Sequence, residues 1–187
     1  MGFLSGLILS KLSIYSKVLK NKTSLIDYYK LKKTNKYILP LISLDNKSFG
    51  SIVEQIVIEH LECIKSSTST YDCSKTVIDI NGNNKTIKFE QKSSRYWRAL
   101  EDFKWQHVIL DHPYDALLLV GIDFQEIKIY CISKCKIIEL HKKGVIKNQG
   151  GGNKGNGQGV WFSRKQVQDH LIELKTLQDF ENFCYNL

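Results

Sequence analysis

The spacing of apolar residues switches between a helical and an alternating period along the chain, and each switch predicts an element. Over residues 48–63 the apolar side chains fall on one broad arc at about 100° per residue, namely Ile52, Val53, Ile56, Val57, Leu61 and Ile64. The opposite arc holds Gln55, Glu59 and Glu62. This pattern predicts an amphipathic helix that packs on a core.

Glu54 does not join the polar arc of this predicted helix. It falls between Ile58 and Leu61, at the edge of the buried face, where an unpaired carboxylate is costly. Two interpretations fit this position: a boundary side chain that reaches solvent or a salt bridge, or a carboxylate directed at a metal site.

Two runs typical of strands, residues 71–80 and 85–90, flank Asn81-Gly82 and predict a hairpin. A fold-back centred on Asn81 places Asp72 opposite Glu90 and leaves Asp79 near the turn. We therefore favour Asp72 over Asp79 as a carboxylate that acts together with Glu90. A β-bulge, or a turn shifted towards Asn84, would reverse that choice.

The segments that follow predict further elements. Residues 95–107 indicate a loop running into a helix, with Tyr96, Leu100 and Phe103 facing inward. Residues 115–122 form a continuous apolar run of strand length, and residues 125–132 alternate, so the two predict a second hairpin with a first strand covered on both faces.

The C-terminal segment predicts two helices, and the last of them serves packing. Ser163 is a candidate cap for a helix containing Val167, Leu171 and Leu174. Basic side chains at the start of that helix are unfavourable for its dipole unless an anion lies nearby. A second candidate capping box runs from Thr176 to Asp179, before Phe180, Phe183 and Leu187.

The order helix, hairpin, helix, hairpin, loop and helix indicates an α/β fold, a mixed β-sheet flanked by α-helices. We expect a basic N-terminal helical segment over residues 1–47, starting with an amphipathic helix, and a core domain over residues 48–187 that contains a glycine-rich loop at 148–159. A chain of 187 residues is long enough to bury a sizeable core.

The net charge is +8, and residues 1–50 hold nine lysines against Asp27 and Asp45. Such a bias suits a polyanionic partner, which binds through phosphate contacts, and it also fits a chain rich in Lys, Ile and Asn throughout. Candidate phosphate contacts are Arg95, Arg98, Lys104, Lys154, Arg164 and Lys165.

Five cysteines without metal-ligand spacing indicate a reducing, cytoplasmic compartment. The apolar start of the chain is short and lacks a basic region, so we expect neither a signal peptide nor a membrane span. The glycine-rich tract lacks Gly-Lys-Ser/Thr, which argues against a nucleotide cofactor. It is interpreted as a loop that orders on DNA, or else as a disordered insertion.

The candidate chemistry lies in Glu90-Gln91-Lys92. Alternate side chains of a strand share a face, so Glu90 and Lys92 point the same way and Gln91 points the other. A carboxylate beside an ammonium group supplies an oxygen ligand for a divalent metal and a cation for a developing negative charge. The simpler interpretation is a charge pair on a solvated strand.

A helix carrying Glu54, then Asp72, then Glu90-Gln91-Lys92, resembles the PD-(D/E)xK phosphodiesterase superfamily of restriction-endonuclease-like nucleases. The resemblance covers about residues 48–94, and Tyr71 stands where the family often has proline. It implies a restriction-endonuclease-like fold in which Asp72 and Glu90 ligate Mg²⁺, with Mn²⁺ as a substitute. It also implies that Lys92 orients or activates the attacking water and that Glu54 assists a second metal or its water shell.

The function implied is a Mg²⁺-dependent DNA endonuclease, resembling type II restriction enzymes, that acts on double-stranded DNA as a homodimer. One alternative is a nucleic-acid-binding module that keeps the fold and performs no chemistry. Another is an interaction protein whose first helix docks a partner, with Glu90 and Lys92 as a surface pair.

Overall fold

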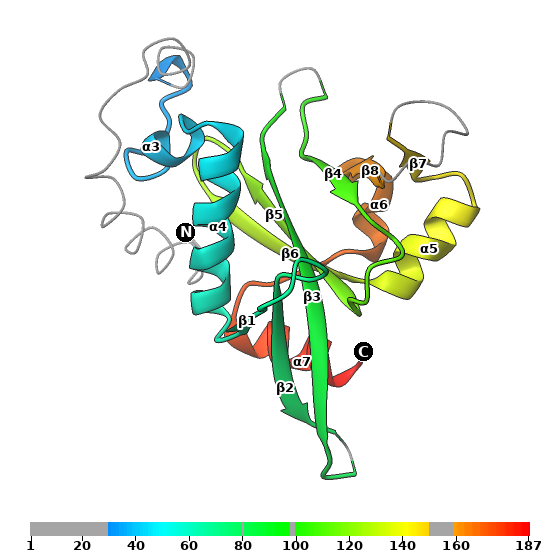
Figure 1. Cartoon of the computed structure of the whole chain (residues 1–187). Helices are drawn as coiled ribbons and strands as arrows, with labels where there is room; N and C mark the ends of the chain where they lie inside the picture. The colour runs from blue at the N-terminus through cyan, green and yellow to red at the C-terminus, as the bar shows by residue number, and fades with distance from the viewer. Residues whose placement is uncertain (1–29, 80, 98–99, 150–158) are drawn as a thin grey trace.

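The computed structural model describes residues 30–79, 81–97, 100–149 and 159–187 (Figure 1). A six-stranded sheet runs in the order β1-β2-β3-β5-β6-β9, and only β3 and β5 are paired in parallel. The mixed α/β class predicted from the sequence is therefore confirmed. The strands of this sheet are β1 (Ile64–Lys65), β2 (Cys73–Ile78), β3 (Asn84–Arg95), β5 (Ala116–Ile122), β6 (Ile127–Ser133) and β9 (Ile172–Glu173).

Two layers cover the sheet. Buried side chains of α4 and α7 pack with those of β2, β3 and β5 in one core. On the other face a smaller sheet, in the order β4-β8-β7, packs with α5 against β5 and β6 in a second core. The remaining bounds are α3 (Leu39–Ile42), α4 (Asn46–His60), β4 (Lys104–Val108), α5 (Lys134–Lys142), β7 (Lys147–Asn148), β8 (Val160–Ser163), α6 (Arg164–Val167), a 3₁₀ turn (Gln168–His170) and α7 (Leu177–Tyr185).

The helix α4 has the predicted apolar face. Val53, Ile56 and Val57 are buried, and the carboxylate of Asp45 caps the first turn by accepting from the Ser48 amide at 3.0 Å. The prediction failed at the C-terminal end. The helix ends at His60, so Ile64 lies in β1 and is 69% exposed rather than part of the buried arc.

The hairpin of β2 and β3 has the predicted register. Cys73 pairs with Phe89 and Ile78 pairs with Asn84. One residue beyond the Cys73–Phe89 pair, the same register sets Asp72 beside Glu90. Asp79 lies at the turn, where its carboxylate accepts from the amides of Asn81 and Asn83, both at 2.8 Å. Asp79 therefore stabilises the turn, and Asp72 is the acid next to Glu90.

The described residues of the range 95–107, which leave out 98–99, do not form the predicted helix. Trp97 forms an antiparallel bridge with Asp102, and the chain then enters β4, which pairs with β8. Buried Phe103 and Trp105 alternate with partly exposed Lys104. A burial pattern that repeats every two residues fits a strand rather than a helix. Leu100, expected to face inward, is 39% exposed.

The run predicted as a doubly covered strand is β5, all seven residues of which are buried. Hydrophobic residues on both of its faces belong to the two cores, and β6 pairs with it as the second predicted hairpin. Gly121 is required here, because a Cβ atom would lie 2.5 Å from the ring of Phe103.

Both predicted caps at the C-terminal end are present. Ser163 and Gln166 form a capping box, but α6 spans one turn only, and Leu171 and Leu174 lie beyond it. An anion does lie at this helix start: the carboxylate of Asp102 accepts from Arg164 Nε at 2.9 Å and from the Lys165 amide at 2.7 Å.

The capping box of α7 gives a pH-dependent prediction. The backbone amides of Lys175 and Thr176 lower the pKa of Asp179 below its ordinary 3.8, so its stabilisation is present above that value and is lost as the pH falls through the lowered pKa. We expect Asp179→Ala to reduce the free energy of unfolding by about 1 kcal/mol at pH 7. Urea titrations of both proteins at pH 7 and pH 3 should show this difference shrinking in acid, and a constant difference would contradict the assignment.

The N-terminal segment is described only from residue 30. Within it Ile38, Leu41 and Ile42 are buried in the same core as α4. The predicted amphipathic helix near the start of the chain, and part of the glycine-rich tract, lie outside the described residues. None of the described helices has the length and apolar character needed to cross a membrane, and all five cysteines are free.

Candidate active site

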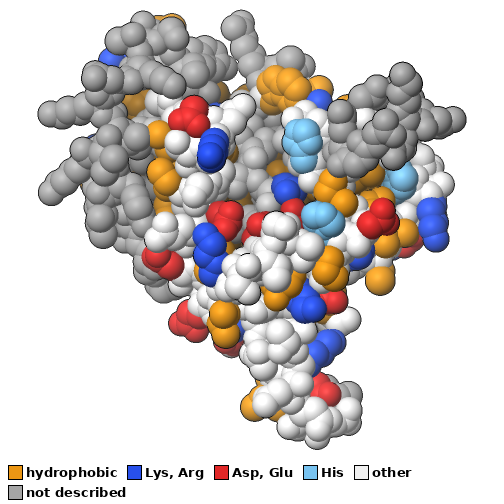
Figure 2. Space-filling model, viewed as in Figure 1, with side chains coloured by type: hydrophobic (Ala, Val, Ile, Leu, Met, Phe, Trp, Pro, Cys, Tyr) orange, Lys and Arg blue, Asp and Glu red, His pale blue; other side chains and the backbone are white. Residues whose placement is uncertain are grey.

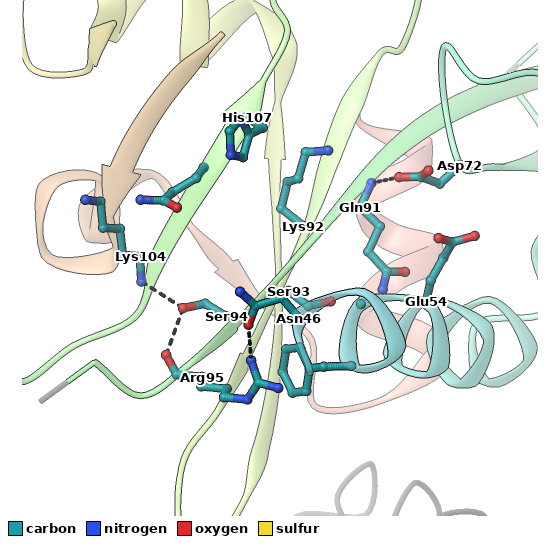
Figure 3. Close-up of a pocket in the computed structure, with 13 residues that line it drawn as sticks. Asn46, Glu54, Asp72, Gln91, Lys92, Ser93, Ser94, Arg95, Lys104 and His107 are labelled. Carbon is teal, nitrogen blue, oxygen red and sulfur yellow. Dashed lines mark hydrogen bonds between the residues drawn. The ribbon is translucent and has the colours of Figure 1, made fainter. Parts of the chain in front are cut away.

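The candidate site lies along the edge of β3 that β2 leaves uncovered. The ladder with β2 stops at Phe89, whereas the ladder with β5 continues to Arg95. A cleft of about 480 Å³ follows this edge between α4 and β4 (Figure 3). It is lined by Asn46, Phe49, Gly50 and Glu54 of α4, by Asp72, by Gln91, Lys92, Ser93, Ser94 and Arg95 of β3, and by Lys104, Gln106 and His107 of β4. Figure 2 shows acidic, basic and histidine side chains gathered on this face.

Asp72 is held at the end of the β2–β3 ladder by two backbone contacts. Its amide donates to the Phe89 carbonyl at 2.9 Å, and its carboxylate Oδ2 accepts from the Gln91 amide at 2.6 Å. The side chain thus takes the place that a further β2 residue would occupy. It fixes one carboxylate oxygen and leaves the cleft edge of β3 open.

Glu90 and Lys92 lie on the same face of β3, as the alternation predicts. Lys92 Nζ lies 2.5 Å from Glu90 Oε1, and the side chains are 24% and 8% exposed. Burial raises the pKa of Glu90, Lys92 opposes that rise, and the charge of Asp72 adds to it. The influence of Asp72 on this pKa agrees with their neighbouring positions in the hairpin. Lys92 lines the cleft, and Glu90 is buried behind it.

Two polar groups that interact electrostatically with Glu90 have no hydrogen-bond partner among the described residues. They are His112 Nδ1 and Tyr114 Oη, both buried. Burial, followed by the charge of Glu90, raises the pKa of Tyr114, so the phenol stays protonated at neutral pH. Glu90 is thus influenced by two neighbouring groups whose hydrogen-bonding capacity is incompletely used.

Gln91 points to the opposite face, towards α4. It is 6% exposed, and neither its amide oxygen nor its amide nitrogen has a hydrogen-bond partner among the residues that the structure describes. Figure 3 shows its side chain extending beside Glu54, with the carboxylate of Asp72 above. A buried amide with both ends unpaired is destabilising, and an amide oxygen is a ligand that hard cations accept.

Glu54 forms the salt bridge that the first of its two sequence interpretations predicts, and its role towards a metal stays a prediction. It forms a salt bridge with Lys65 at 3.3 Å, with the carboxylate side chain 27% exposed, and it also lines the cleft. In the part of the chain that the structure describes, no three His, Cys, Asp or Glu side chains gather closely enough to hold a metal. The oxygen donors of Glu54, Asp72 and Gln91, with Glu90 next to Asp72, nevertheless suit Mg²⁺ in chemical type.

The unpaired amide of Gln91 gives a prediction that separates binding from stability. We expect Gln91→Met to raise the free energy of unfolding in EDTA by about 1 kcal/mol, because an apolar side chain of similar shape removes the unpaired groups. We also expect Mg²⁺ to raise the melting temperature of the wild type, and Gln91→Met to remove part of that increase. Thermal melts with and without Mg²⁺ measure both effects, and a loss of stability in EDTA would contradict this view of Gln91.

The predicted phosphate contacts fall in different environments. The Arg95 guanidinium donates to the carbonyls of Ile42 and Leu44 and to Asn46, which ties β3 to the start of α4. Arg164 pairs with Asp102, and Lys165 Nζ donates to the Leu100 carbonyl at 3.2 Å. Lys104 lines the cleft, whereas Arg98 and Lys154 lie outside the described residues.

Sequence reasoning missed several groups that line the cleft. Gln91 was placed only as the side chain facing away from Glu90 and Lys92, and its unpaired amide is visible only once α4 is packed against β3. Asn46 and Gln106 carry no motif, and strand pairing and packing alone bring them here. No local sequence pattern signals these two residues.

The chain was also compared with known proteins. No protein-family model matches it, and no curated protein matches it.

Proposed function

We propose that the protein is a Mg²⁺-dependent DNA endonuclease with a restriction-endonuclease-like fold. The observation that supports this most is the open edge of β3, where Asp72, the unpaired Gln91 amide and Lys92 line one cleft. The order of α4, the β2–β3 hairpin and the parallel strand β5 agrees with the mixed, helix-flanked sheet that the resemblance implies.

In this proposal Asp72 and Glu90 hold Mg²⁺, with Mn²⁺ as a substitute. Glu54 and Gln91, which lie on the other side of β3 from Glu90, would support a second metal or its water shell. The metal, when bound, lowers the pKa of a water molecule and offsets negative charge at the phosphate. Burial and the Asp72 charge both oppose ionisation of Glu90, so a cation at this position would favour the carboxylate form.

Lys92 has two roles in this mechanism. Its contact with Glu90 holds the ammonium group at the cleft, where it can donate to the attacking water or to a phosphate oxygen. As a fixed cation in a partly buried position, it stabilises the charge that develops as the phosphodiester bond breaks. Lys104 of β4, another residue of the cleft lining, would bind a neighbouring phosphate.

The substrate is proposed to be double-stranded DNA, cut in both strands by a homodimer, because one chain offers one such cleft within its described residues. Sequence-specific cutting, as in type II restriction enzymes, belongs to the same proposal.

The test is cleavage of supercoiled and linear DNA in Mg²⁺, Mn²⁺ or EDTA, beside Asp72→Asn purified in the same way. We expect metal-dependent cutting by the wild type only, with salt-sensitive DNA binding retained by both proteins. Binding without cutting in any metal would instead favour the non-catalytic nucleic-acid-binding module. A protein that neither binds nor cuts DNA would instead favour the third alternative, an interaction protein whose first helix docks a partner.

A further inference from the structure

Two tryptophans flank Lys104 at one wall of the cleft. Trp97, which follows β3, is 44% exposed, and Trp161 of β8 is partly exposed. Lys104 Nζ lies 4.3 Å from the ring centroid of Trp97 and 3.8 Å from that of Trp161. Neither ring belongs to the two hydrophobic cores, whereas the third tryptophan, Trp105, is fully buried. The two outer rings are therefore not needed to fill the interior.

The spacing of the two rings suits a nucleobase. Because the same ammonium group contacts both, their centroids lie no more than about 8 Å apart. Stacked bases are spaced by about 3.4 Å, so a base between two aromatic rings requires about 7 Å. The Lys104 ammonium thus occupies the space between the two rings. A flat aromatic group in that space would contact more of both ring faces.

The position of these rings connects them to the cleft. Lys104 is one of the residues that line the cleft, and its backbone amide donates to Ser94 Oγ on β3 at 3.0 Å. On the other side, Trp97 is fixed by its bridge to Asp102. A nucleotide whose phosphate lies in the cleft would find the cation for that phosphate and the rings for its base at one place.

We propose that Trp97 and Trp161 form a stacking site for an unpaired nucleobase, which Lys104 vacates to contact the adjacent phosphate. A base inside a duplex has both faces covered by its neighbours, so only a single strand, a bulge or an extruded base can enter. The inference rests on the proposed function for the identity of the cleft ligand. It narrows the substrate to nucleic acid with an unpaired nucleotide near the cleavage point.

The test measures binding in EDTA, where cleavage does not interfere. The probes are a labelled oligothymidine of eight nucleotides, a blunt duplex, and the same duplex with one bulged thymine; the readouts are anisotropy and quenching of tryptophan fluorescence. We expect Trp97→Ala to weaken binding of the single strand and the bulged duplex about tenfold or more, and to leave the blunt duplex within about twofold. Trp97→Phe should restore most of the affinity, because it keeps a stacking ring.

Tyr185→Ala is the matched control, since Tyr185 is 50% exposed and lies on α7, away from the cleft lining. It should leave all three affinities unchanged, and near-ultraviolet circular dichroism should verify that each variant is folded. Equal loss for all three probes, or no loss for any, would overturn the stacking site. Competition of the single strand by tetramethylammonium at low millimolar concentration would overturn it too, in favour of a site for organic cations.

The outcomes for the two proposals are distinguishable. Loss of single-strand binding by Trp97→Ala in a protein that cuts no DNA would support the stacking site and remove the nuclease. Metal-dependent cutting, together with no effect of Trp97→Ala on the binding of any probe, would support the nuclease and remove the stacking site.

Discussion

Replacing Lys92 by methionine is expected to lower the rate of Mg²⁺-dependent DNA cleavage by about a hundredfold to a thousandfold. Removal of one fixed group that stabilises transition-state charge has an effect of this size. Methionine keeps much of the length and apolar character of the lysine side chain, so the fold should be preserved. The loss of Lys92 should also raise the pKa of Glu90 further, because the lysine charge opposes the effect of burial. The measurement is single-turnover cleavage of a plasmid, together with DNA binding in Ca²⁺.

Lys88→Met is the matched control for this prediction. Lys88 lies on the same strand and face as Lys92 and contacts the Tyr71 ring, but it does not line the cleft. Its substitution should leave the cleavage rate within about threefold, the effect of a surface charge on steering. Equal rates for Lys92→Met and the wild type would remove Lys92 from the proposed mechanism, and equal losses for both variants would indicate a general effect of charge.

Replacing Arg164 by methionine is expected to lower the free energy of unfolding by about 3 kcal/mol. Its partner Asp102 has a side chain only 1% exposed, and removal of one member of a buried pair leaves an uncompensated charge. The Lys165 amide remains as a donor to Asp102 and limits the loss. Urea denaturation at pH 7 measures the difference.

The comparison for this second prediction is Lys143→Met on α5. Lys143 also forms an ion pair, with Glu139 at 2.6 Å, but its side chain is 64% exposed. An exposed pair is screened by solvent, so this variant should unfold at the wild-type urea concentration. If the two variants lost the same stability, burial of Asp102 would not be the cause.

The parts of the fold that the sequence predicted are those set by local rules. The turn at Asn81-Gly82 fixed the register that places Asp72 next to Glu90, and the alternation of β3 placed Glu90 and Lys92 together. The capping boxes at Ser163 and Thr176 were also read correctly, because their hydrogen bonds join residues three positions apart.

The parts that were missed depend on distant contacts. Residues 95–107 carry a helical and an alternating pattern at once, and pairing of β4 with β8 decides between them. Arg95 was predicted as a phosphate contact, yet its guanidinium binds carbonyl groups around α3, some fifty residues earlier in the chain. No spacing rule predicts such a partner, and none predicts the two ring contacts of Lys104.

The uncovered edge of β3 also bears on aggregation. An exposed strand edge offers backbone donors and acceptors to which a strand of another molecule can add. Here the edge lies at the floor of a cleft, between α4 and β4, with the side chain of Lys92 over it. α4 and β4, which form the walls of the cleft, leave room for an extended ligand but keep a strand of another molecule from pairing along Gln91–Arg95. The protein can therefore keep this strand edge open without association of sheets between molecules.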